Sequence, residues 1–204
     1  KYNIEYIDAY HTLIHIYHIK QQYKKAKDLI EQGYKQTQNI IFYKVRGQNY
    51  SLQNISDKAI EQYELYLAKS HDDYQIHHYL AVEYLKLDKT EEAAEHNLKA
   101  LKINPEHAES CHNLAVIYLI QNKLDPALRY WMQALQQEPS NLDYLYNIGV
   151  VYNYKGLYTD ALIYFKKVLT AEPKHYNAIV NIATIYLKKY MPAEAKFFYQ
   201  KALQ

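Results

Sequence analysis

The chain has 204 residues, with 24 basic and 22 acidic side chains and a net charge of +2 at pH 7. It holds no long basic run, so we expect no nucleic acid partner, and its single cysteine, Cys111, excludes an intramolecular disulfide and a multi-cysteine metal site. No apolar run approaches the roughly 20 residues that a bilayer-spanning helix needs, and no signal peptide is visible, so we expect a cytoplasmic protein without direct membrane insertion.

Residues 1–6 carry no repeated pattern, but from residue 7 onward small and aromatic residues return at a nearly constant interval. The interval is clearest in one row of small residues, 34 positions apart at each step: Ala81, Ala115, Gly149 and Ala183. A fixed interval of this size indicates a repeat array rather than one globular core. We expect a single array over residues 1–204, with repeats at 7–39, 40–73, 74–107, 108–141, 142–175 and 176–204. The first repeat is degenerate, and the last is expected to be truncated.

Each repeat is predicted to fold as two antiparallel helices. In the third repeat, Leu80, Ala81 and Tyr84 recur at helical spacing, which predicts a first helix over about residues 74–87. A polar turn follows, and Thr90 is expected to cap the second helix. Gly156 marks the same turn in the fifth repeat.

Prolines are predicted to mark the ends of the second helices. Pro126 and Pro192 fall where a first turn is expected, and a missing backbone N–H does no harm there. Pro105, Pro139 and Pro173 are expected to end second helices and to set the turn into the next repeat.

Small residues are predicted to let the two helices of each repeat approach closely. On the first helices they are Gly47, Ala81, Ala115, Gly149 and Ala183. On the second helices they are Ala59, Ala93, Ala127, Ala161 and Ala195. Recurring tyrosines, together with Trp131 and Phe165, are expected to fill the space between helices.

The period and this residue pattern resemble the tetratricopeptide (TPR) repeat, and the resemblance covers nearly the whole chain. It implies an all-α fold, a right-handed superhelical solenoid of helix-turn-helix units whose first helices line a concave groove. It also implies a non-catalytic scaffold or adaptor, not an enzyme, whose partner is a protein or an extended peptide bound in that groove.

Helical spacing identifies the residues that face the groove. In the fourth repeat Leu114, Ala115 and Tyr118 are expected to face the core. The remaining positions of that helix, Glu109, His112, Asn113 and Val116, are therefore expected to face the groove. Stepping by one repeat gives the candidate peptide-binding residues: Tyr79, His112, Asn113, Val116, Tyr146, Asn147 and Asn181.

Three of these residues form a row of asparagines, Asn113, Asn147 and Asn181, which resembles the asparagine ladder in the TPR superhelix of O-linked N-acetylglucosamine transferases. An asparagine side chain offers both a donor and an acceptor, so it can pair with both backbone groups of a peptide. Neighbouring first helices roughly 10 Å apart would place one asparagine at about every third residue of an extended peptide. The alternative is that these side chains bond only neighbouring side chains or water.

A well-known TPR subclass binds the C-terminal carboxylate of chaperones through a clamp of Lys, Asn and Arg side chains. At the positions of that clamp this chain has Lys44, Gln48, Tyr79, Glu109 and Asn113. Two of the basic groups are missing, so we predict that the chain is not a carboxylate clamp.

No cofactor is expected, because no phosphate loop, nucleophile elbow or Ser/His/Asp pattern is found. Asp8, His11, His15 and His18 lie three and four residues apart on one face of the first helix, which is a weak candidate for a metal site. The alternative is a polar, solvated wall, which we favour because no second segment offers ligands.

Two other functions stay open at this point. One is the substrate-recruiting arm of a larger enzyme, such as a glycosyltransferase. The other is an envelope factor like the TPR lipoproteins of type IV pilus assembly. Apolar residues near the C-terminus, Phe197, Phe198 and Leu203, also leave self-association through that end open.

Overall fold

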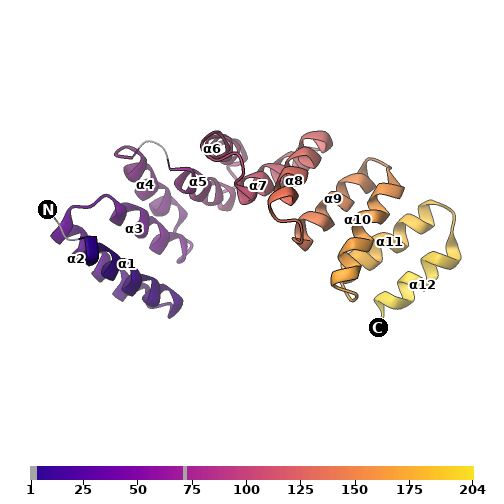
Figure 1. The fold of residues 1–204 in the computed structure, drawn as a ribbon, viewed down its shortest axis with the longest axis horizontal. Coiled ribbons are helices and arrows are strands. Elements are labelled where there is room, and N and C mark those ends of the chain that lie inside the picture. The colour runs from indigo at the N-terminus through magenta and orange to yellow at the C-terminus, as the bar shows by residue number, and fades with distance from the viewer. Residues whose placement is uncertain (1–3, 71–72) are drawn as a thin grey trace. The chain divides into compact units, whose positions relative to one another are not determined.

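The computed structural model describes residues 4–70 and 73–204, and within these ranges the chain forms α-helices and no β-strand. The helices, labelled as in Figure 1, are α1 (Ile4–Ile19), α2 (Tyr23–Thr37), α3 (Ile41–Ser51), α4 (Ser56–Leu67), α5 (Tyr74–Lys86), α6 (Thr90–Ile103), α7 (Ala108–Ile120), α8 (Leu124–Gln137), α9 (Leu142–Tyr154), α10 (Tyr158–Ala171), α11 (Tyr176–Lys188) and α12 (Pro192–Ala202). The predicted all-α fold is confirmed, and the first helix of the third repeat lies within one residue of its expected end.

The chain divides into two compact halves, Lys1–Pro105 and Glu106–Gln204, which we call the N-terminal half and the C-terminal half. In the N-terminal half α1 packs on α2, α3 on α4 and α5 on α6, and the pairs stack through α2 with α3 and α4 with α5. In the C-terminal half α7 packs on α8, α9 on α10 and α11 on α12, and the pairs stack through α8 with α9 and α10 with α11. Each half is therefore a short solenoid of helical pairs. The exact division of the chain into six repeats stays a prediction.

The turn inside each helical pair is built around a residue with left-handed backbone. These residues are Gln21, Asn54, Asp88, Asn122, Gly156 and Tyr190. In every such turn the next amide donates to the carbonyl of a tyrosine five positions earlier, as from Lys89 to Tyr84 at 2.9 Å. This bond satisfies a carbonyl that the end of the first helix leaves open. The turn predicted at Gly156 is confirmed, with φ of 73°.

The cap predicted at Thr90 is wrong. Helix α6 begins at Thr90 itself, and the preceding Lys89 supplies no side-chain cap. The Thr90 hydroxyl instead donates to the Glu91 carboxylate at 3.0 Å. The backbone bond from Lys89 to Tyr84 closes the turn one residue earlier, so Thr90 already lies inside the helix. The proline predictions are confirmed: Pro192 begins α12, and Pro105 follows the end of α6 by two residues.

Small residues bring the helices of a pair together, as predicted. A Cβ atom added at Gly47 would lie 2.4 Å from the Tyr63 ring of α4, and one added at Gly149 would lie 2.8 Å from the Phe165 ring of α10. Tyr63 and Phe165 are themselves almost fully buried. In the C-terminal half Phe165 belongs to an apolar cluster contributed by α9, α10 and α11. The core thus lies between the two helices of a pair and continues into the first helix of the next pair.

Candidate functional site

The asparagine row lies on successive first helices of the C-terminal half, with Asn113 on α7, Asn147 on α9 and Asn181 on α11. All three side chains are partly exposed. Helices α9 and α11 contact each other directly, so residues of neighbouring pairs do meet on this face. The Asn181 Nδ2 atom donates to the Tyr146 hydroxyl at 3.1 Å, which brings together two of the predicted site residues.

The amide of Asn181 is occupied by bonds within the chain. Its Nδ2 atom also donates to the carbonyl of Asn177 at 2.9 Å, and its Oδ1 atom accepts from Asn153 Nδ2 at 3.5 Å. A peptide would have to displace one of these partners in order to bind Asn181. In this conformation the Asn181 side chain bonds neighbouring groups of the chain, which is the alternative to peptide binding given in the sequence analysis.

The amides of Asn113 and Asn147 have a different environment. Asn113 Nδ2 is a buried donor atom with no hydrogen-bond partner among the described residues. For Asn147 no side-chain hydrogen bond is found within the part of the chain that the structure describes. A buried donor without a partner costs roughly 1–3 kcal/mol, so Asn113 would gain from a carbonyl oxygen, which reaches Nδ2 only when the side chain turns toward solvent.

His112 and Tyr146, beside the row, are tied to the core. The His112 Nδ1 atom accepts a hydrogen bond from the Nε1 of the fully buried Trp131 at 3.1 Å. Burial lowers the pKa of His112, so the ring is neutral at pH 7 and its remaining proton is on Nε2. Tyr146 packs its ring 5.6 Å from Phe165. Val116, on α7, is partly exposed.

The anchoring of Trp131 by His112 was not predicted from the sequence. The two residues are 19 positions apart on different helices, and a histidine at a first-helix position carries no signal of such a partner. The consequence is that His112 both contributes to the candidate site and holds α8 against α7.

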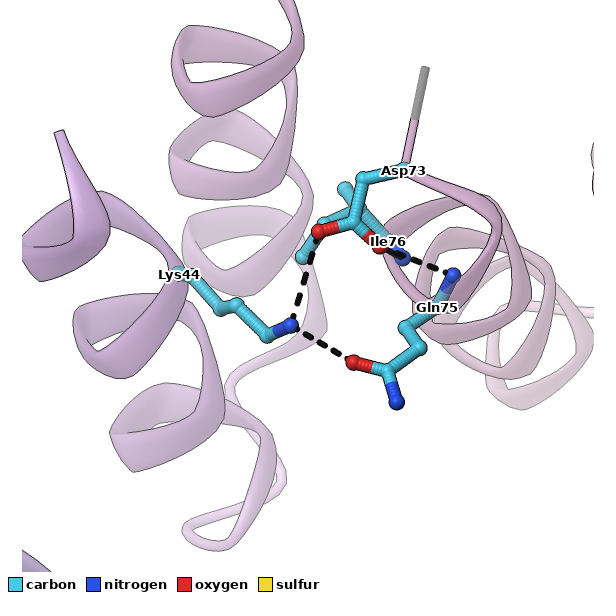
Figure 2. Close-up of polar contacts among 4 residues, drawn as sticks. All are labelled: Lys44, Asp73, Gln75 and Ile76. Carbon is cyan, nitrogen blue, oxygen red and sulfur yellow. Dashed lines mark hydrogen bonds and ion pairs between the residues drawn. The ribbon is translucent and has the colours of Figure 1, made fainter. Parts of the chain in front are cut away.

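Tyr79 lies in the N-terminal half, on α5, with its ring 5.7 Å from that of Tyr63. Figure 2 shows the polar contacts of the nearby Lys44, whose Nζ atom is 2.8 Å from Gln75 Oε1 and 3.5 Å from Asp73 Oδ2. The other Asp73 oxygen caps α5 by accepting from the amides of Gln75 and Ile76. Lys44 is thus engaged inside the chain, and the absence of a carboxylate clamp stays a prediction.

The N-terminal half also contains a pocket of about 430 Å³ on the side of its first helices. Its lining comes from α1, α3, α4 and α5: His15, His18, Ile19, Gln48, Ser51, Leu52, Tyr63 and Tyr79. Of the predicted peptide-binding residues Tyr79 lies in it, and so do His15 and His18 of the weak metal candidate.

The weak metal candidate on α1 gains no support from the geometry. Asp8, His11 and His15 are exposed, whereas His18 is partly buried with its Nε2 atom 3.1 Å from Asn49 Oδ1. Among the described residues no group of three or more His, Cys, Asp or Glu side chains could hold a metal ion. Cys111 is buried, and burial raises the pKa of its thiol to about 11, so it is an unreactive core residue as expected. Over residues 4–70 and 73–204, no helix combines the length and apolar character needed to cross a bilayer.

Comparison with protein families gives tetratricopeptide-repeat matches over residues 74–107 and 112–176. The fold is similar to the crystal structure of MamA, with a TM-score of 0.73 and 22% identity over 77% of this chain and 92% of that one. It is also similar to residues 41 to the end of MamA from Desulfovibrio magneticus RS-1, with a TM-score of 0.76 and 14% identity over 80% of this chain and 93% of that one. Comparison with curated proteins gave no significant match.

The structural likeness to MamA, at such low identity, concerns the fold alone. The family matches go further, because tetratricopeptide repeats are modules of protein–protein interaction and their fold is typically non-catalytic. The family matches agree with the helical pairs and with the glycine contacts inside them. The chain is therefore a tetratricopeptide repeat protein and, in general terms, an interaction scaffold.

Proposed function

We propose that the C-terminal half is a non-catalytic adaptor that binds an extended segment of a partner protein along α7, α9 and α11. In this proposal the side chains of Asn113 and Asn147 bond the backbone of the bound segment. Tyr146, His112 and Val116 then form the surface beside that backbone.

The unused amide groups carry this proposal. Asn113 has a buried donor without a partner, which a rotation of its partly exposed side chain would present, and Asn147 has a donor and an acceptor on the next first helix. The two residues are 34 positions apart, so they occupy equivalent places in successive helical pairs. An extended peptide repeats its carbonyl and amide groups at regular spacing, and side-chain amides can pair with both groups whatever the peptide sequence is.

Asn181 is expected to contribute less to binding than the other two asparagines. Its bonds to Tyr146 and Asn153 must be given up first, so a new bond to peptide replaces an existing one. The net contribution of such an exchange is close to zero, because the number of hydrogen bonds hardly changes.

The experiment is a quantitative crosslinking pull-down from the source cell, comparing the wild-type chain with the triple variant Asn113→Ala, Asn147→Ala and Asn181→Ala. The matched control removes two exposed side-chain amides from α8 instead, by Gln136→Ala and Gln137→Ala. We expect partner proteins to be captured by wild type and control and lost in the triple variant at matched folded fraction. Retention of the same partners by the triple variant would show that binding does not use the asparagine row.

A further inference from the structure

The first helices of the C-terminal half end in side chains that continue the asparagine row. The last residues of α7, α9 and α11 are Ile120, Tyr154 and Lys188. Each lies seven positions after an asparagine of the row, and seven positions make about two helical turns, so each shares a helix face with its asparagine. A segment bound along the asparagines therefore also passes these three side chains.

The two apolar side chains of this set are exposed to solvent. Ile120 is 70% exposed and Tyr154 is 68% exposed, so neither side chain fills the core. Val116 and Val150 lie between them and the asparagines, one on each helix, and both are partly exposed. Single exposed apolar residues are common, but here the same arrangement recurs on two successive first helices, and contiguous apolar surface marks interaction sites. The ends of α7 and α9 thus suit apolar side chains of a partner.

The end of α11 differs, because it carries a cation. Lys188 Nζ lies 3.4 Å from Asn153 Oδ1 and 5.5 Å from the centroid of the Tyr158 ring. Among the described residues no carboxylate forms an ion pair with Lys188. The lysine at the end of α9, Lys155, is instead paired with Asp125. A net positive charge is therefore available at the end of α11 and not at the end of α9.

The starts of the same helices carry the opposite charge. Glu109 on α7 and Asp143 on α9 lie four positions before their asparagines and are exposed, whereas the equivalent residue of α11 is the neutral Asn177. A negative side chain of a bound segment is repelled over α7 and α9 and attracted at Lys188. The acidic residue of a partner is thus expected at α11, and the apolar residues are expected at α7 and α9.

The spacing of the three helices sets the spacing of these side chains along the bound segment. Packed helices lie about 8–10 Å apart. In the polyproline II conformation three residues make one turn and span about 9 Å, so side chains three positions apart point the same way and meet successive helices. That conformation has no internal hydrogen bonds, so its carbonyl groups are free to accept from the amides of Asn113 and Asn147.

We propose that the segment bound by the C-terminal half carries two apolar side chains and one acidic side chain, each three positions from the next. The apolar side chains lie at Ile120 and Tyr154, and the acidic side chain pairs with Lys188. The assignment rests on the proposed function, because it takes the segment to run along α7, α9 and α11 beside the asparagines. It adds the class of side chain that the partner carries at each helix.

The test is an NMR titration of the purified chain, following the backbone amide signals of Ile120, Tyr154 and Lys188. Two glutamate probes cover both chain directions: acetyl-Leu-Ala-Pro-Leu-Ala-Pro-Glu-amide and acetyl-Glu-Ala-Pro-Leu-Ala-Pro-Leu-amide. Matched probes replace the glutamate by lysine or both leucines by serine. We expect saturable shifts at all three residues with at least one glutamate probe, and about tenfold weaker binding of its lysine and serine forms. Equal binding of either form, shifts that map elsewhere, or no saturable binding of either glutamate probe would overturn the proposal.

Reversing one charge locates the acidic residue of the segment. In Lys188→Glu attraction and repulsion change places, so the lysine form is expected to bind more tightly than the glutamate probe. The matched control Lys174→Glu makes the same charge change at an exposed residue beside the opposite end of α11, and it is expected to keep the preference for glutamate. A glutamate preference that survives in Lys188→Glu, or that is lost in the control, would refute the pairing with Lys188.

The apolar contacts are tested by Ile120→Ser and Tyr154→Ser, which change largely exposed side chains and so leave the fold intact. Each variant is expected to bind the glutamate probe at least about fivefold more weakly, with an unchanged urea midpoint. Undiminished binding in either variant would refute the apolar positions. The proposed function has its own readout, because it fails when the asparagine variant retains its partner proteins even if the probes bind as expected.

Discussion

The contact of Gly149 with Phe165 gives a sharp test of how the helical pairs are held together. A Cβ atom at position 149 would lie 2.8, 2.9 and 3.1 Å from three ring atoms of Phe165, where ordinary contacts begin near 3.4 Å. The ring is fully buried among α9, α10 and α11, so it cannot swing into solvent. Gly149→Ala must therefore push α9 and α10 apart or deform the cluster.

The magnitude follows from two opposing effects. Forcing one extra methyl group into a packed core costs about 1–3 kcal/mol. Replacing glycine by alanine inside a helix stabilises the folded chain by about 0.5–1 kcal/mol, because alanine loses less backbone entropy on folding than glycine does. Taking the middle of both ranges, Gly149→Ala is thus expected to reduce the free energy of unfolding by about 1 kcal/mol. Gly47→Ala should cost more, since its Cβ would lie 2.4 Å from Tyr63.

The assay is urea unfolding followed by circular dichroism, with a double-mutant cycle between Gly149→Ala and Phe165→Leu. Shrinking the ring should relieve the crowding, so the double variant is expected to be more stable than the sum of the two single changes predicts. A Gly149→Ala variant as stable as wild type, or additive effects in the cycle, would show that the glycine is not needed for close approach.

Two further predictions concern the turns and the response to acid. Tyr190 has left-handed backbone with φ of 57°, so Tyr190→Gly should raise the free energy of unfolding by about 1 kcal/mol. Gly156 has the same backbone conformation, so Gly156→Ala should lower the free energy of unfolding by a similar amount, although the added Cβ atom meets no atom within 4 Å. Urea midpoints of the two variants that fail to move in opposite directions would contradict this. Burial, and then the adjacent His77, lowers the pKa of His96 from 6.5 to about 4, so the unfolded chain takes up this proton first. Stability from this residue is complete above pH 6.5 and is lost as the pH falls toward 4. His96→Phe keeps a ring against Tyr84 and removes the titration, so its urea midpoints should fall less between pH 7 and 4 than those of wild type.

Most of the fold could be predicted because the repeat makes the same local signals occur again and again. The small residues on five of the first helices, the left-handed turns and the closing prolines after α6, α8 and α10 each depend on local sterics, which act over a few positions of sequence. The turn at Gly156 and the approach at Gly149 are examples that the structure confirms. The predicted N-cap at Thr90 was wrong because a polar residue near a helix start is a weak signal when a backbone hydrogen bond already closes the turn.

The contacts that shape the candidate sites could not be predicted in the same way, because they join residues on different helices. Glu83 is a buried carboxylate held by Ser51 and Lys86, yet in the sequence it is one of many acidic residues on a helix. His112 likewise shows no local sign that it anchors Trp131. Side-chain pairing across helices depends on rotamers and on the angle between helices, and the repeat pattern specifies neither.

The three asparagines show how residues that are equivalent in sequence acquire different roles, and the difference can be measured. Asn181 bonds Tyr146 and Asn153, whereas Asn147 has no such partners among the described residues. Asn181→Ala should therefore lower the free energy of unfolding by about 1–2 kcal/mol, at roughly 1 kcal/mol for each partly exposed bond lost. Asn147→Ala should change it by less than about 0.5 kcal/mol, as surface substitutions do. Comparing urea midpoints of the two single variants separates these expectations. Equal losses would mean that the hydrogen bonds of Asn181 add nothing to the fold, and its amide would then be as free for a peptide as that of Asn147.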